Sequence, residues 1–208
     1  MSLSRFYEAL FHRAPIQVVI HIAMVVVAVL ISIVISIPCG IFLSREKYKK
    51  YSWIVINILN VFQTIPAFAF IAVSMPLLGL GYKPTIVVLV IQSLLPIARS
   101  TIVGLCEVNE NIKEAAKGMG MSKSQILFQV ELPLALPMII SGIKTSTVYV
   151  VSVATLGGFI GAGGLGVLIS SGMSMLWPEF LIVGALLCAI IAISMDKFWG
   201  FIEKKIAV

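Results

Sequence analysis

Residues able to do acid–base, nucleophilic or metal chemistry are few in this sequence, and they are scattered. The two histidines, His12 and His21, stand at no metal-binding spacing such as HExxH. The three cysteines, Cys39, Cys106 and Cys188, form no CxxC pair. We therefore expect no metal site, no disulfide framework and no catalytic residues in this chain.

One glycine motif formally matches a cofactor signature. Gly161-x-Gly163-x-x-Gly166 satisfies GxGxxG, but no strand–helix–strand pattern surrounds it, as a dinucleotide site requires. No GxxxxGK[ST] sequence occurs, so we expect no Walker-type ATP site. We interpret the glycines as an outer turn or as close backbone packing, and we expect no cofactor in this chain.

The stretch from residue 111 to 133 is charged and amphipathic, and it favours two short helices joined at a glycine. Asn111 can cap the first helix, with Glu114 three residues later, and Gly118 and Gly120 can end it. Its N-terminal position also lets Glu114 stabilise that first helix through the helix dipole.

The second of these helices has its own start and stop signals. Ser122 can cap it, Gln125 stands three residues later, and Pro133 closes it. Apolar residues in a segment outside the bilayer suggest a docking surface for a partner protein. Apolar residues of this segment include Met119, Met121, Ile126, Leu127 and Val130.

Polar residues next to a proline interrupt one of the apolar segments. Gln63-Thr64-Ile65-Pro66 places two polar side chains beside a residue that removes a backbone donor. This arrangement suits a translocation path, and it suits a packing kink equally well.

The elements that must position these residues are membrane helices. The chain has 208 residues, is 60% hydrophobic and only 12% charged, and has a mean hydropathy of +1.09. These values predict an all-α membrane protein, since a span needs about 20 apolar residues. The five expected spans are roughly residues 18–42, 53–78, 85–103, 138–158 and 180–199.

The basic residues indicate an orientation. With the N-terminus outside and the C-terminus in the cytoplasm, twelve of the fifteen Lys and Arg residues lie at the inner side or nearest inner span ends. The residues left outside are Arg5, Arg13 and Lys83. The same bias explains the net charge of +6 without nucleic acid, and we expect Lys144 to reach the cytoplasmic interface.

The spacing within the polar stretch resembles a known family. Glu114-Ala115-Ala116, Gly120 and Val130-x-Leu132-Pro133 match the EAA loop of binding-protein-dependent ABC importer permeases. The alternative is an ordinary amphipathic helix pair on a membrane protein. The resemblance implies a type I ABC importer permease fold with a cytoplasmic coupling-helix loop.

Further motifs are similar to those of osmoprotectant importers, which carry glycine betaine, carnitine or choline. They include Leu95-Pro96-Ile97-Ala98-Arg99 and Gly142-Ile143-Lys144-Thr145. The chain departs from that family at Ser100-Thr101, where Asn-Thr is usual, and at Lys144, where Arg is usual. Because the Gly161–Gly166 motif also resembles methionine importers, a permease for methionine remains the alternative.

The resemblance implies a single permease domain over residues 1–208, with a core at about 16–200 and a coupling loop at 111–133. It implies a cytoplasmic ATPase dimer that binds ATP and Mg²⁺, a second permease subunit, identical or paralogous, and an extracellular or periplasmic binding protein. The location implied is the bacterial inner membrane, with lipids as neighbours. An ion-coupled secondary transporter is less favoured because the span interiors lack acidic residues.

Residue roles follow from the same resemblance. The residues expected to couple to the ATPase are Glu114, Ala115, Ala116, Gly120, Met121, Ile126, Leu127 and Pro133. The residues expected on the translocation path are Gln63, Thr64 and Pro66.

Overall fold

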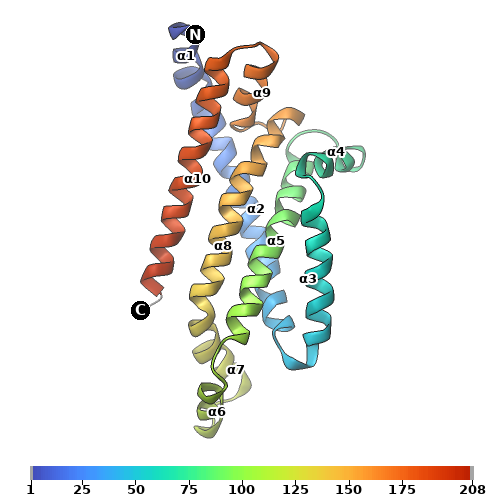
Figure 1. The fold of residues 1–208 in the computed structure, drawn as a ribbon, viewed down its shortest axis with the longest axis vertical. Coiled ribbons are helices and arrows are strands. Elements are labelled where there is room, and N and C mark those ends of the chain that lie inside the picture. Colours follow the sequence, from blue (N-terminus) through green and yellow to red (C-terminus); the bar gives the residue numbers. More distant parts are fainter. Residues whose placement is uncertain (1, 207–208) are drawn as a thin grey trace.

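The structure is a computed structural model that describes residues 2–206. Helices make up nearly all of this range, and no strand occurs in it (Figure 1). The α-helices are α1 (Leu3–Tyr7), α2 (Ala14–Leu43), α3 (Lys49–Thr64), α4 (Ala67–Leu78), α5 (Tyr82–Cys106), α6 (Glu110–Gly118), α7 (Lys123–Ile126), α8 (Leu132–Ala154), α9 (Gly166–Ser174) and α10 (Pro178–Ile206). Two π-helical segments, Glu8–Arg13 and Leu127–Glu131, and two 3₁₀ segments, Glu46–Tyr48 and Thr155–Ile160, lie between them.

Within residues 2–206, four helical stretches are long and apolar enough to cross a membrane. They are Leu3–Leu43, Tyr82–Cys106, Lys123–Ile160 and Pro178–Ile206. Helices α3 and α4 pass the same test only as a pair that is bent by 94°. The predicted all-α membrane fold with about five spans is confirmed.

The bend between α3 and α4 follows from Pro66. A proline disfavours helical backbone in the residue before it, and Ile65 is extended with ψ of 123°. Helix α3 therefore ends at Thr64, and α4 turns away from its axis (Figure 1). The sequence predicts an interruption here, and the structure has a right-angled turn.

Helix α5 is the centre of the bundle, because it packs against both α2 and α8. Small residues allow α5 and α8 to approach each other closely. A Cβ atom built on Gly142 of α8 would lie 2.5 Å from the Cβ atom of Ser100 on α5. Between the same helices, the Ser146 hydroxyl donates to the Ser93 carbonyl at 3.2 Å.

The prediction that the fourth span begins after Pro137 is wrong. Helix α8 starts at Leu132 and contains Pro137. Proline removes only its own backbone donor, and neighbouring helices let a membrane helix tolerate it.

Further along α8, Lys144 lies 3.5 Å from the Asp196 carboxylate and 3.8 Å from that of Glu203, so α10 neutralises its charge.

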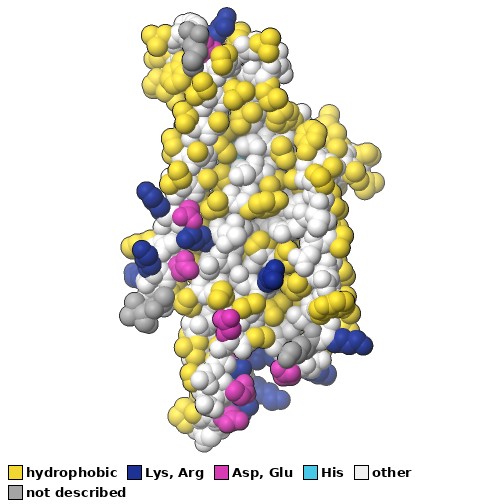
Figure 2. Space-filling view, in the orientation of Figure 1, with side chains coloured by type: hydrophobic (Ala, Val, Ile, Leu, Met, Phe, Trp, Pro, Cys, Tyr) yellow, Lys and Arg dark blue, Asp and Glu magenta, His cyan; other side chains and the backbone are white. Residues whose placement is uncertain are grey.

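Charged side chains are unevenly distributed over the molecule. Figure 2 shows apolar side chains over the upper part of the visible face, with Lys and Arg gathered mostly below, around α6, α7 and the C-terminal part of α10. Fewer basic side chains are visible at the end that holds the N-terminus. Helices α6 and α7 therefore lie at the charged end of the bundle, opposite α1 and α9 (Figure 1).

Candidate functional site

The segment at the charged end, residues 109–131, is here called the tip segment. Its first helix, α6, begins at a different cap from the predicted one. The side chain of Asn109 accepts a hydrogen bond of 2.9 Å from the Asn111 amide, so Asn109 is the N-cap and Asn111 lies in the first turn. The prediction of Asn111 as the cap is wrong, because the Asn111 amide is itself the donor that the Asn109 side chain caps.

Glu110, not Glu114, is the acidic residue in the first turn of α6. Its carboxylate lies 3.0 Å from the Lys113 ammonium and 3.8 Å from that of Lys117. The hydrogen bond from Lys113 and the positive charge of both lysines hold the pKa of the Glu110 carboxyl below its ordinary value. Among the residues that the structure describes, Glu114 is exposed and has no ion pair, so its carboxylate remains available.

The turn between α6 and α7 depends on one glycine. Gly120 has φ of +81°, in the left-handed region that L side chains rarely adopt, and nothing lies within 4 Å of a Cβ atom built there. The predicted capping box is confirmed: the Gln125 amide donates to the Ser122 hydroxyl, and the Ser122 amide donates to the Gln125 side chain at 2.8 Å. These local bonds fix the direction in which the chain leaves the turn.

The prediction that Pro133 closes the second helix is also wrong. Helix α7 continues through the π-helical turn Leu127–Glu131 into α8, so Lys123–Ile160 forms one helical stretch. Pro133 occupies the first turn of α8. The wider π-helical turn before it leaves room for a ring that would otherwise clash with the preceding turn. The tip segment is therefore joined directly to a long span.

The residues predicted to couple to a partner divide into an exposed and a buried group. The exposed residues are Glu114, Ala115, Gly120 and Pro133. Met121 and Leu127 are partly exposed, whereas Ala116 and Ile126 are buried within the chain. Ala116 and Ile126 are therefore covered by other parts of the chain, and the exposed group forms the outer surface of the tip segment.

Two large apolar side chains dominate that outer surface. Met119 is 75% exposed and Phe128 is 63% exposed. Met119 is among the apolar residues expected from the sequence, but Phe128, which lies between Leu127 and Val130 in the same apolar run, is not. Helical spacing alone could have found it, since Ser124 and Phe128 are four residues apart on the face opposite Ile126.

A partly buried ion pair ties the tip segment to the residues that follow α2. The Arg45 guanidinium lies 2.7 Å from the Glu131 carboxylate, whose side chain is only 7% exposed. The Arg45 Nη1 group also donates a hydrogen bond of 3.1 Å to Glu131 Oε1, so the pair combines a hydrogen bond with a close charge contact. This pair is not predicted from the sequence, because the two residues are 86 positions apart.

The predicted path residues lie at the bend between α3 and α4. The Gln63 side-chain amide donates to the Gln92 carbonyl of α5 at 3.1 Å. Thr64 and Pro66 are exposed, and the Thr64 hydroxyl donates to the Val61 carbonyl at 2.7 Å. Gln63 thus fastens the end of α3 to α5, and the two exposed residues remain on the surface beside it.

The glycine-rich segment 161–166 packs against α2, as expected of close backbone packing. The Leu165 amide donates to His21 Nδ1 at 3.3 Å, and His21 Nε2 lies 3.1 Å from the Val151 carbonyl. His21 is fully buried, and both of its ring nitrogens have a partner. Within residues 2–206, no three His, Cys, Asp or Glu side chains come together as a metal site.

The helix bundle and its exposed tip segment lead to a comparison with known protein families. The family model described as "binding-protein-dependent transport system inner membrane component" matches residues 36–208. The chain belongs to this family. The permease fold and the resemblance seen in the tip segment are therefore confirmed.

Named relatives of this permease share most of its length. It is 42% identical to the choline transport system permease protein OpuBB of Bacillus subtilis, over 89% of this chain and 85% of that protein. Identity is also 42% with the B. subtilis glycine betaine/carnitine/choline transport system permease protein OpuCB, at the same coverage. Identity with the carnitine transport permease protein OpuCB of Listeria monocytogenes is 36%, over 99% of this chain and 93% of the relative.

A solved structure shares the fold of this permease. The similar chain belongs to the MetNI methionine ABC transporter in an inward-facing conformation. The TM-score is 0.82, the two chains cover 99% of each other, and their identity is 24%. This likeness concerns the fold, which is that of an ABC importer permease.

Proposed function

We propose that this chain is the permease subunit of an ATP-driven importer and forms the translocation path for a quaternary-amine osmoprotectant such as glycine betaine, carnitine or choline. The observation that carries the proposal is the 42% identity with two permeases named for choline and for glycine betaine, carnitine and choline, over 89% of the chain. The osmoprotectant motifs around Arg99 and Lys144 support the same solute class.

In this proposal, the energy comes from partner proteins. ATP and Mg²⁺ bind to a cytoplasmic ATPase dimer, and this chain contributes no catalytic residue. A second permease subunit, identical or paralogous, completes the path, because five spans form only part of a pore wall. A binding protein delivers the solute from outside.

The tip segment is proposed to dock onto the ATPase. The residues that take part are those of the resemblance: Glu114, Ala115, Ala116, Gly120, Met121, Ile126, Leu127 and Pro133. Exposed apolar side chains and an unpaired Glu114 carboxylate support a docking surface. Because α7 continues into α8, movement of the docked tip passes directly to a span.

The path is proposed to run beside the bend at Gln63, Thr64 and Pro66, within a single permease domain over residues 1–208. This role is supported by the exposure of Thr64 and Pro66 at the helix break. It is also supported by the hydrogen bond from the Gln63 side chain, which holds the break against α5.

The proposed orientation places α6 and α7 in the cytoplasm and the N-terminus outside. The concentration of Lys and Arg at the α6–α7 end supports it (Figure 2). Single cysteines, introduced in a background without the native ones, test it with an impermeant thiol reagent on whole cells. Tyr82→Cys should label and Lys47→Cys and Ser122→Cys should not; labelling of Ser122→Cys from outside contradicts the orientation.

A methionine importer is the second candidate, favoured by the Gly161–Gly166 motif, which resembles that of methionine importer permeases. Proteoliposomes that contain the permease, its ATPase and its binding protein separate the candidates. Uptake of glycine betaine or choline should require ATP and should persist when an ionophore collapses the proton gradient. Uptake of methionine alone would support the second candidate, and uptake without ATP would support an ion-coupled transporter.

A further inference from the structure

Arg99 is a charged residue of a membrane-spanning helix, and the described part of the chain gives it no polar partner. It lies on α5, seven residues before the end of that helix at Cys106, and its side chain is exposed. Among residues 2–206, the structure gives it no hydrogen bond and no ion pair. Lys144 differs, because two carboxylates of α10 neutralise it. Ionisable groups in spans commonly mark a substrate pathway, so the missing partner of Arg99 requires an explanation.

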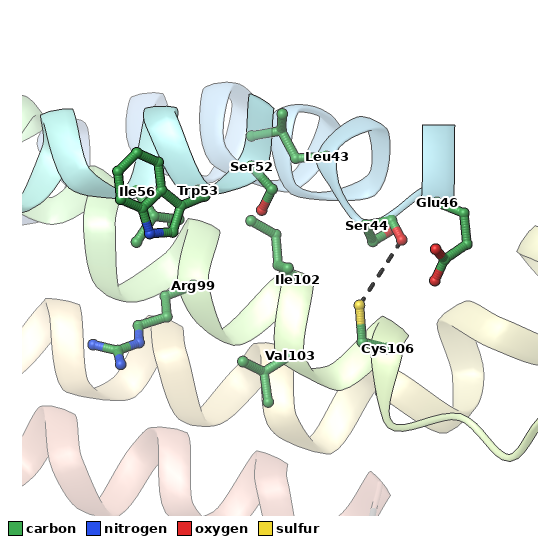
Figure 3. Close-up of a pocket in the computed structure, with 10 residues that line it drawn as sticks. All are labelled: Leu43, Ser44, Glu46, Ser52, Trp53, Ile56, Arg99, Ile102, Val103 and Cys106. Carbon is green, nitrogen blue, oxygen red and sulfur yellow. Dashed lines mark hydrogen bonds between the residues drawn. The ribbon is translucent and has the colours of Figure 1, made fainter. Parts of the chain in front are cut away.

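Arg99 lines a cavity of about 330 Å³ between α3 and α5, near the charged end of the bundle. Trp53 of α3 lines the same cavity, and this residue is 72% exposed. Figure 3 shows both side chains toward one side of the cavity, away from Ser44, Glu46 and Cys106. The cavity volume lies within the range of small-molecule sites.

The two side chains suit the two ends of a zwitterion. A guanidinium binds a carboxylate through two parallel hydrogen bonds, a geometry that an ammonium does not offer. The face of an indole ring attracts a methylated ammonium group, whose charge is spread over its methyl groups. A small molecule with a carboxylate and a quaternary ammonium could therefore contact Arg99 and Trp53 together.

We propose that Arg99 and Trp53 form a solute subsite on the translocation path, in which Arg99 selects solutes that carry a carboxylate. This inference rests on the proposed function and adds residues and a selection rule to it. Glycine betaine and carnitine carry both groups. Choline carries the ammonium but a hydroxyl in place of the carboxylate, so it depends on Trp53 and not on Arg99.

The test uses the complete importer in proteoliposomes, with radiolabelled glycine betaine and choline and saturating binding protein. Arg99→Gln should lower glycine betaine uptake about tenfold or more, as expected for loss of a charged hydrogen-bonding partner, and leave choline uptake within about twofold. Trp53→Ala should lower uptake of both solutes, and Trp53→Phe should restore most of it. The matched control is Lys83→Gln, an exposed basic residue at the opposite end of α5, which should change neither.

Stimulation of ATP hydrolysis by the loaded binding protein separates a subsite from a structural role. It should stay within about twofold of wild type in Arg99→Gln, because the tip segment is untouched. Unchanged glycine betaine uptake in Arg99→Gln overturns the inference. An equal loss of glycine betaine and choline uptake in this variant also overturns it, and indicates that Arg99 contacts a subunit or lipid instead. If the unmodified importer transports choline but not glycine betaine, the inference is also overturned. If it transports neither solute, the proposed function itself is overturned.

Discussion

The two ends of the molecule are held together by different kinds of contact. At the end with the N-terminus, buried groups from distant segments join: His21 contacts both Val151 and Leu165. The Ser2 amide donates to the Glu179 carboxylate, and the Arg5 guanidinium lies 4.7 Å from the centre of the Trp177 ring. These contacts cross-link α1, α2, α8 and α10.

The tip segment at the other end is held mainly by bonds between neighbours in sequence. Asn109 caps α6, and Ser122 with Gln125 caps α7. The Arg45–Glu131 ion pair links this segment to a distant part of the chain. Exposed Met119 and Phe128 lie on its surface.

From this difference we infer that the end with the N-terminus stabilises the fold, whereas the tip segment interacts with a partner. Contacts between distant segments make the N-terminal end a rigid unit whose loss should cost stability. Local caps make the tip segment a preformed shape that can move as a body with α8, and its exposed apolar groups favour a partner. Variants at the first end should therefore change stability, and variants at the second should change coupling.

The largest expected effect is at the exposed apolar surface. Phe128→Asp places a charge where the ATPase would cover an aromatic ring, so ATPase co-purification should be lost, a change of about 2 kcal/mol or more in binding. Leu176→Asp is the matched control, since Leu176 is 86% exposed at the opposite end. It should leave ATPase attachment unchanged. Equal loss in both variants would erase the distinction between the two ends.

Breaking the Arg45–Glu131 pair should have the next largest effect. Arg45→Ala leaves the Glu131 carboxylate buried without its partner, at a cost of roughly 2 kcal/mol, less than for a fully buried pair because Arg45 is 38% exposed. The ATPase should remain attached, but stimulation of hydrolysis by the binding protein should fall. Lys47→Ala, on an exposed neighbour, should not lower it. Normal stimulation in Arg45→Ala would show that the pair does not transmit movement.

At the N-terminal end, His21→Leu should act on stability alone. The change removes two buried hydrogen bonds and leaves the Leu165 amide and the Val151 carbonyl unpaired, at about 1–2 kcal/mol. The thermal midpoint of the detergent-solubilised complex should fall. Uptake per folded complex should match wild type, and a selective loss of coupling would contradict this assignment.

The capping box should give the smallest effect. Ser122→Ala removes one cap bond and should cost about 1 kcal/mol within the tip segment. Uptake should fall less than in Arg45→Ala, and amide exchange in α7 should speed up. Unchanged exchange in α7 would show that packing of Ile126, not the cap, holds this turn.

Features that depend on neighbours in sequence could be predicted well. Long apolar runs gave the spans, and Ser122 with Gln125 gave a correct capping box. The positive φ at Gly120 also follows the expectation for a helix stop. In each case a few adjacent residues decide the conformation.

Features that depend on distant packing could not be predicted. Two asparagines stand two positions apart, and the sequence alone does not distinguish which of them caps α6; in the structure it is Asn109. A π-helical turn lets the chain pass Pro133, and no local pattern in the sequence marks it. The Arg45–Glu131 pair joins residues that only the folded bundle brings together.

The most direct test of the account compares two glycines of the tip segment. A Cβ atom meets nothing within 4 Å at either Gly118 or Gly120, but only Gly120 has positive φ, +81°. Gly120→Val should strain the turn by about 1–3 kcal/mol, whereas Gly118→Val should be tolerated.

The measurement is ATPase co-purification together with solute uptake in proteoliposomes for both variants. The account predicts normal membrane insertion in both, loss of ATPase attachment and uptake in Gly120→Val, and near wild-type values in Gly118→Val. Wild-type uptake in Gly120→Val, or equal loss in both variants, would contradict the claim that the left-handed turn of the tip segment couples this permease to its ATPase.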